Sequence, residues 1–116
     1  MAFAEYIRER RESLRSEDKR YSLRQVAQRI GVQPAYLSRI ERGDFPPPSE
    51  EKIGLLAAEL GVDCDVLLAM AGKVSKDLQA IIRARPALFA EFIRALKSAP
   101  DDQVLELARE IRDGDW

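Results

Sequence analysis

The sequence predicts an all-α protein, and three observations support this prediction. Helix-forming residues, chiefly Ala, Leu, Arg and Glu, dominate the chain, and aromatic residues, which strands favour, make up only 7% of it. Apolar residues recur at helical spacing, and no stretch shows the alternation of Val, Ile and Thr that marks a strand. The 116 residues suit one small domain followed by an appendage.

The first helix is expected from about Ala2 to Leu14, where apolar residues recur on one face. Its inner face is expected to consist of Phe3, Ile7 and Leu14, with Tyr6 beside them. The polar and charged segment that follows, RSEDKRY, is expected to form a surface loop.

Two short helical patterns meet at a glycine in residues 23–43, LRQVAQRIGVQPAYLSRIERG. Gly31 can adopt the positive φ with which helices often end, and Ser22 with Gln25 three residues later forms a capping box at the start of the first pattern. The apolar residues of the two patterns are Leu23, Val26, Ala27 and Ile30 in the first and Leu37 and Ile40 in the second. Two helices joined by a short turn that contains glycine form a helix-turn-helix, which indicates DNA binding.

Two further helices are expected after the stiff connection DFPPP. Ser49 caps the first of them and Gly61 ends it, while Asp63 caps the second. The residues expected in the core are Ile53, Leu56, Ala57 and Leu60 from the first helix and Val66, Leu67 and Met70 from the second. Together with the three helices before them, they complete a five-helix core.

Residues 73–116 are predicted to form a C-terminal module of three short amphipathic helices, the second and third beginning at Pro86 and Pro100. The module carries eight basic and eight acidic residues, and it has more apolar surface than so small a unit can easily bury alone. We therefore expect it to form a homodimer interface, and the alternative is that it packs on the first five helices. The residues expected at the interface are Leu88, Phe89, Phe92, Ile93, Leu96, Leu105 and Ile111.

The residue types present exclude several classes of function. The chain has no histidine and one cysteine, which excludes catalytic His and Cys-His pairs and zinc sites built from Cys and His. The carboxylates are scattered over polar faces, and no G-x-x-x-x-G-K phosphate loop is present, so neither an enzyme nor a cofactor is expected. The single cysteine, Cys64, is expected to be a partly buried structural thiol.

The N-terminal stretch MAFAEYIRERR carries charges from Glu5 onward and has no apolar signal-peptide core. No apolar run approaches the ~20 residues that span a bilayer. We therefore expect a cytoplasmic protein without a membrane partner.

Positive charge is concentrated on the helix-turn-helix, although the whole chain has a net charge of −1. Residues 19–42 contain six basic residues against one acidic residue, a net charge of +5, and residues 44–72 contain one basic residue against six acidic ones, a net charge of −5. Because salt screens charges over ~8 Å at physiological ionic strength, the local charge decides the attraction to phosphates. The charge pattern therefore fits a nucleic-acid partner.

The run SLRQVAQRIGVQPAYLSRIERG, followed by PPPSEEKIGLLAAELGV, closely resembles the Xre/Cro-type helix-turn-helix family of phage and bacterial repressors. The similarity extends from about Tyr6 to Gly72. Its most specific pieces are the spacing of Ala27, Gly31, Leu37 and Ile40, the I-E-R-G at residues 40–43, and the Pro48-Ser49 that opens the next helix.

The resemblance implies a five-helix, lambda-repressor-like DNA-binding domain over residues 1–72. It also implies a sequence-specific transcriptional regulator, most often a repressor that binds a palindromic operator on double-stranded DNA as a homodimer. In that family the arginine that matches Arg11 typically pairs with the glutamate of I-E-R-G, so an ion pair between Arg11 and Glu41 is implied. The alternative is that both side chains face water.

The second helix of the motif is expected to begin near Gln33-Pro34, because proline suits a first helical turn. It is expected to lie in the major groove and to read bases with its exposed face. Arginine can donate two hydrogen bonds to guanine, glutamine can pair with adenine, and alanine can touch a thymine methyl group. The residues expected to read bases are Gln33, Ala35, Tyr36, Ser38 and Arg39. Pro34 stands where the family often has a polar base-reading residue, so base reading is expected to shift to its neighbours. The alternative for all of them is a solvated helix face.

Basic and hydroxyl side chains around the motif are expected to bind DNA phosphates. They are Ser22, Arg24, Arg42, Lys19, Arg20 and Lys52. Lys19 and Arg20 end the segment RSEDKRY, which is longer than the usual turn of the family, and a solvated loop is the alternative for both. For Lys52, which follows two glutamates, a solvated position is equally expected.

A second class of function stays open for the C-terminal module. The chain could be an antitoxin, or another interaction protein, whose C-terminal helices bind a partner protein while its DNA binding is autoregulatory. The partner could be a toxin, or a peptidase that inactivates the regulator. The two classes separate on whether a C-terminal fragment holds a second protein.

Overall fold

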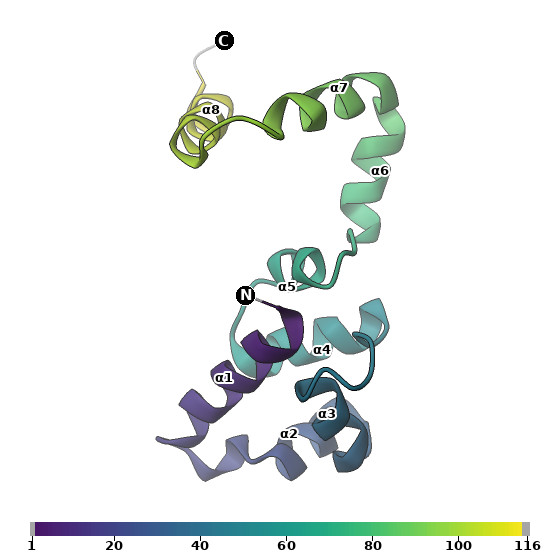
Figure 1. Cartoon of the computed structure of the whole chain (residues 1–116), viewed down its shortest axis with the longest axis vertical. Helices are drawn as coiled ribbons and strands as arrows, with labels where there is room; N and C mark the ends of the chain where they lie inside the picture. Colours follow the sequence, from purple (N-terminus) through teal and green to yellow (C-terminus); the bar gives the residue numbers. More distant parts are fainter. Residues whose placement is uncertain (1, 115–116) are drawn as a thin grey trace. The chain divides into compact units, whose positions relative to one another are not determined.

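The computed structural model describes residues 2–114, in which the chain is helical and no strand occurs. The all-α prediction is confirmed. Residues up to Ser75 form one compact unit, the N-terminal unit, and residues from Lys76 onward form a second, the C-terminal unit. Figure 1 labels the helices of both units in chain order.

The N-terminal unit contains the helix-turn-helix and the hydrophobic core. Its helices are α1 (Phe3–Arg15), the 3₁₀ helix η1 (Lys19–Tyr21), α2 (Leu23–Ile30), α3 (Pro34–Glu41), α4 (Glu50–Leu60) and α5 (Cys64–Met70). Helix α4 packs against α2 and α5, and α1 packs against α3 and α4. The apolar side chains buried between them are Phe3, Ile7, Val26, Ala27, Ile30, Leu37, Ile40, Ile53, Leu56, Ala57, Leu60, Leu67 and Leu68. These residues fix α2 and α3 on a rigid support.

The segment expected to be a plain surface loop contains one turn of helix. The carboxylate of Asp18 accepts a hydrogen bond from the Arg20 N–H at 2.9 Å and so caps η1. This turn also changes the capping box predicted for α2. Ser22 Oγ accepts a hydrogen bond from the Gln25 N–H as predicted, at 3.2 Å. The Ser22 N–H, however, donates to the Lys19 carbonyl within the η1 turn and not to the Gln25 side chain, so the reciprocal bond of the capping box is not made.

The prediction that Val66 lies in the core is wrong, because its side chain is 55% exposed. Leu68 is buried in its place. Cys64, Leu67 and Leu68 of α5 pack on the core, as does Ala71 at its C-cap. Met70, which was predicted in the core, is partly buried against it. Because Leu67 and Leu68 are adjacent, the sequence allows two apolar stripes offset by one residue, one that includes Val66 and one that includes Leu68. The structure buries the stripe that includes Leu68.

The implied ion pair between Arg11 and Glu41 is present and joins α1 to α3. Arg11 Nε and Glu41 Oε2 lie 2.7 Å apart, and both side chains are 5% exposed. The alternative, in which both face water, is therefore wrong. The hydrogen bonds to Glu41 raise the pKa of Arg11 still further above the physiological range.

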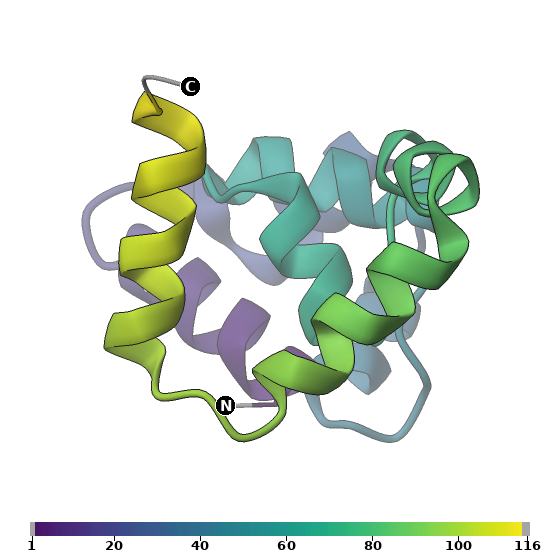
Figure 2. The ribbon, with the colours of Figure 1, turned by 90° about the horizontal axis from the view of Figure 1, so that it is seen from above.

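The C-terminal unit consists of α6 (Lys76–Ala84), α7 (Pro86–Leu96) and α8 (Asp101–Asp113). In Figure 2 the chain leaves α7, turns and enters α8. Pro86 is the first residue of α7 as expected, whereas Pro100 precedes α8 as its N-cap. No residue of these three helices is buried within the described part of the chain. The apolar sides of these amphipathic helices therefore do not enclose a buried core.

Among residues 2–114, no helix is both long enough and apolar enough to cross a membrane.

Candidate nucleic-acid interface

The turn between α2 and α3 is set by local sequence. Gly31 adopts a left-handed conformation with φ of 76°, which permits the chain to leave α2 sharply. The Val32 N–H then donates to the Ala27 carbonyl at 3.0 Å, and Val32 packs against the core. Gln33 is extended and Pro34 begins α3, where its missing N–H costs nothing. Both helix starts thus lie where they were predicted.

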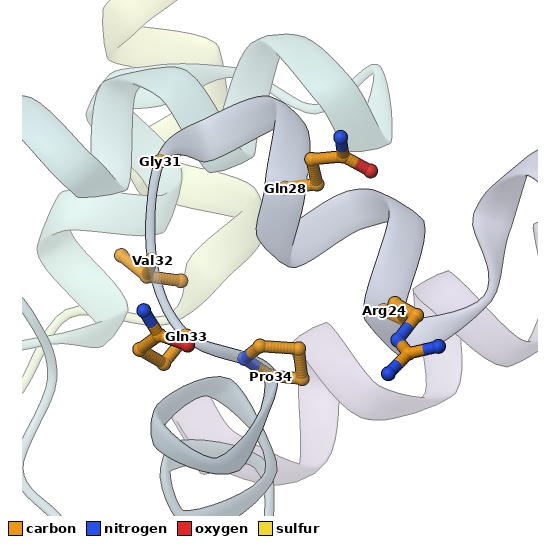
Figure 3. Close-up of a pocket in the computed structure, with 6 residues that line it drawn as sticks. All are labelled: Arg24, Gln28, Gly31, Val32, Gln33 and Pro34. Atoms are coloured by element: carbon orange, nitrogen blue, oxygen red, sulfur yellow. The ribbon is translucent and has the colours of Figure 1, made fainter.

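An open hollow of about 570 Å³ lies along this turn (Figure 3). It is lined by Arg24 and Gln28 from α2, by Gly31, Val32 and Gln33 of the turn, and by Pro34 at the start of α3. A cation, two amides and apolar groups therefore share one exposed surface, beside the exposed face of α3.

The buried side of α3 determines which residues it exposes. Leu37, Ile40 and Glu41 are buried against the other helices. Among the five predicted base-reading residues, Gln33, Ala35 and Arg39 are exposed, and Tyr36 and Ser38 are half-buried. The structure thus brings these five side chains to the exposed face and edge of one two-turn helix.

Arg39 makes a contact that was not predicted. Its guanidinium carbon lies 5.2 Å from the centre of the Phe45 ring, a cation–π distance. The Phe45 ring in turn lies 5.9 Å from the Tyr36 ring, with 49° between the two planes. An aromatic residue two positions after I-E-R-G was the only sequence signal for this group.

The predicted phosphate-binding residues fall into two groups. Lys19 and Arg24 are exposed, and no carboxylate among residues 2–114 forms an ion pair with them. The same holds for Arg39, which is predicted to read bases. Arg20 and Arg42, by contrast, lie close to carboxylates that stand just outside residues 19–42 in the sequence. Arg20 binds Asp18 at 2.8 Å, and Arg42 lies 3.5 Å from Asp44.

These pairs reduce the charge expected for the motif. Arg29 is also paired, since its Nε lies 2.6 Å from Glu59 Oε2 and its guanidinium carbon lies 5.5 Å from the centre of the Tyr21 ring. Three of the six basic residues between 19 and 42 therefore have a carboxylate partner from outside that range, and the net charge of +5 overstates the local field. The hydrogen bond from Arg20 lowers the pKa of Asp18 below its usual range, which favours the charged carboxylate of this pair.

Ser22 and Lys52 have structural roles beside any contact with DNA. Ser22 Oγ accepts the capping bond of α2, which leaves its O–H able to donate to a phosphate. Lys52 Nζ donates to the Ile30 carbonyl at 3.0 Å and is half-buried, so the fully solvated position expected as its alternative is wrong. The positive charge of Lys52 lies at the carbonyl end of α2, where the helix dipole favours a cation.

Comparison with known proteins identifies the family. A family model described as helix-turn-helix matches residues 7–67, which is more than half of the chain. Neither a curated protein nor a solved structure matches the chain. The matched segment contains α2, the glycine turn and α3 with the residues described above. The chain belongs to the Xre/Cro-type helix-turn-helix family and is a DNA-binding transcriptional regulator.

Proposed function

We propose that this regulator is a repressor that binds a palindromic operator as a homodimer, with α3 in the major groove. The observation that carries the proposal is the exposed face of α3, on which Ala35 and Arg39 lie, together with Gln33, which shares the hollow at the turn with the exposed cation Arg24. A helix of this kind fits the width of the major groove of B-DNA. Repression then requires only that the bound protein occupy the operator.

The chemistry of the α3 side chains suits direct reading of bases. Arg39 offers two parallel N–H donors that match O6 and N7 of guanine, and no carboxylate of the described chain competes for them. Gln33 can bind adenine with its amide, and Ala35 can contact a thymine methyl group. Tyr36 and Ser38, at the half-buried edge, can add one hydrogen bond each.

Phosphate binding is assigned first to Lys19 and Arg24, because both are exposed cations that have no carboxylate partner among residues 2–114. To bind a phosphate, Arg20 must leave Asp18, or its guanidinium must contact the phosphate and the carboxylate together. The same holds for Arg42 and Asp44. We therefore expect Arg24→Ala to weaken binding to every sequence, and Arg20→Ala to have a smaller effect.

A homodimer is proposed from the C-terminal unit. An open hollow of about 630 Å³ there is lined mainly by apolar side chains of α6, α7 and α8, including Ile81, Leu88, Phe92 and Ile111. A single recognition helix makes few contacts, and regulators of this type bind two half-sites ~34 Å apart. Pairing of two chains would cover the apolar faces that lack a core. It would also present two α3 helices to a symmetric operator.

The proposal is tested by selecting DNA from a pool of duplexes with a randomised core. Wild type is expected to enrich a palindromic sequence, and Arg39→Ala is expected to lose ~1–3 kcal/mol of specific affinity and its preference at one position of each half-site. Arg15→Ala, which removes an exposed arginine at the end of α1, is the matched control. Equal weakening of Arg39→Ala on selected and random DNA would move Arg39 to the phosphates, and no enrichment by wild type would refute the proposal.

In the antitoxin alternative, the same exposed apolar side chains of the C-terminal unit bind a different protein. The oligomeric state of the purified chain therefore distinguishes this alternative from the homodimer. Sedimentation of the purified chain at micromolar concentration is expected to give a dimer. A monomer whose C-terminal unit remains exposed would favour a different protein as its partner.

A further inference from the structure

The ring of Phe45 lies against the arginine on which base reading depends. The distance of 5.2 Å from its centre to the guanidinium carbon of Arg39 lies within the range of cation–π attraction. We propose that Phe45 is a positioning residue that holds Arg39 in the conformation that reads guanine. This inference rests on the proposed function, in which Arg39 reads a base.

The backbone places the Phe45 ring relative to Arg39. The N–H groups of Asp44 and Phe45 both donate to the Arg39 carbonyl, at 2.9 and 3.3 Å. Gly43, with φ of 78°, provides the turn that brings the chain back to this carbonyl. The position of the ring is therefore defined by the same residue whose side chain it contacts.

Tyr36 connects this pair to the core. It precedes Arg39 by three residues and so lies on the same side of α3. Its half-buried ring packs against the hydrophobic core and contacts the Phe45 ring at 5.9 Å. Phe45, which is itself 36% exposed, is thus supported from the interior and presents its face to Arg39 at the surface.

Contact with an aromatic face takes up none of the guanidinium's hydrogen bonds, so the N–H donors of Arg39 stay available for a base. These donors are the ones that pair with O6 and N7 of guanine. An unsupported arginine would lose more side-chain entropy on binding, because it must select one conformation among many. Phe45 therefore favours guanine binding without touching the base.

The test measures base preference in the randomised duplex pool. The first step locates the guanine position whose preference is lost in Arg39→Ala. At that position Phe45→Leu, which keeps apolar bulk but removes the ring, is expected to lower the preference for guanine by about two- to five-fold. Phe45→Trp, which keeps an aromatic face, is expected to retain it. In the Arg39→Ala background, Phe45→Leu is expected to change nothing further at that position.

The possible outcomes distinguish this inference from the function on which it rests. Full guanine preference in Phe45→Leu would overturn the positioning role, as would an equal loss in Phe45→Trp. A Phe45→Leu effect that persists in the Arg39→Ala background would show that Phe45 acts on DNA itself, which also overturns it. If wild type enriches no sequence, or Arg39→Ala changes no position, then base reading by Arg39 has failed and the positioning role fails with it.

Discussion

Arg11 and Glu41 form a two-pronged ion pair in the interior of the N-terminal unit. Arg11 Nε donates to Glu41 Oε2 at 2.7 Å, and a second guanidinium nitrogen donates to Oε1 at 2.9 Å. A third donates to the Tyr21 carbonyl at 3.2 Å. One buried side chain of α1 thereby holds both the end of α3 and the η1 turn.

Breaking this pair from one side is expected to be costly. Arg11→Met or Glu41→Leu alone should lower the free energy of unfolding by ~3–5 kcal/mol, because each leaves a buried charge without its partner. The double variant should recover much of that loss, since two apolar side chains replace the two charges together. Urea denaturation followed by circular dichroism measures all three.

Arg15→Met on the same helix is the control for that series, because Arg15 is exposed. It is expected to change the free energy of unfolding by less than about 0.5 kcal/mol. A double variant that loses the sum of the two single losses would show that the two side chains are not coupled.

The features that could be predicted from the sequence are those that depend on neighbouring residues. Ser22 caps α2, Gly31 ends it with positive φ, and Pro34 begins α3, and each effect acts within a few residues. The bounds of the helix-turn-helix followed from these local rules. The pairing of Arg11 with Glu41, thirty residues away, came only from family resemblance.

Contacts between distant elements and between side chains were missed. Lys52 bonds to the carbonyl of Ile30 and Arg29 to Glu59, and nothing in the local sequence of either cation indicates its partner. Phe45 was missed for a different reason, since its contact depends on how the chain folds back after α3. The base-reading and phosphate-binding assignments remain predictions.

Removing the carboxylate of Asp18 is expected to release Arg20 for DNA. Asp18→Asn keeps a side-chain oxygen that can cap η1 but removes the charge that binds Arg20 at 2.8 Å. Affinity for random duplex DNA should rise, and the slope of log affinity against log salt should steepen by about one. Glu17→Gln is the matched control, since it removes the same charge one residue away without releasing Arg20.

The pH dependence of this contact has a defined sign. Because Arg20 lowers the pKa of Asp18, the pair is fully formed above the ordinary carboxyl pKa and is lost only as pH falls through the lowered value. The chemical shift of the Asp18 carboxyl carbon, followed by NMR, should change at a lower pH than that of an unpaired aspartate.

Equal effects of Asp18→Asn and Glu17→Gln on DNA binding would mean that only the net charge of the protein affects its affinity for DNA.

A charge placed on the apolar face of α7 is expected to separate the proposed dimer. Phe92 is partly exposed and lines the apolar hollow of the C-terminal unit described above, so Phe92→Glu would put a carboxylate where two chains are proposed to meet. Sedimentation should show a shift from dimer to monomer, and binding to the selected palindrome should weaken more than binding to a single half-site.

Val66→Glu is the control for Phe92→Glu. Val66 is an exposed apolar residue of comparable accessibility in the N-terminal unit, so the same charge change there should leave the dimer intact. Dissociation by both variants would indicate a general effect of charge, and dissociation by neither would remove α7 from the interface.

The thiol of Cys64 is expected to react slowly with alkylating reagents in the folded protein. Burial raises the pKa of this thiol, and the carboxylates of Asp65, Asp63 and Glu50 raise it further. Since only the thiolate is nucleophilic, a raised pKa leaves less of it at neutral pH. The rate of reaction with iodoacetamide should therefore reach its midpoint at a higher pH in buffer than in concentrated urea. Asp65→Asn should move the folded midpoint down, because Asp65 raises this pKa more than the other two carboxylates do. Reaction that is slow at every pH but keeps the midpoint found in urea would mean that limited access alone protects Cys64.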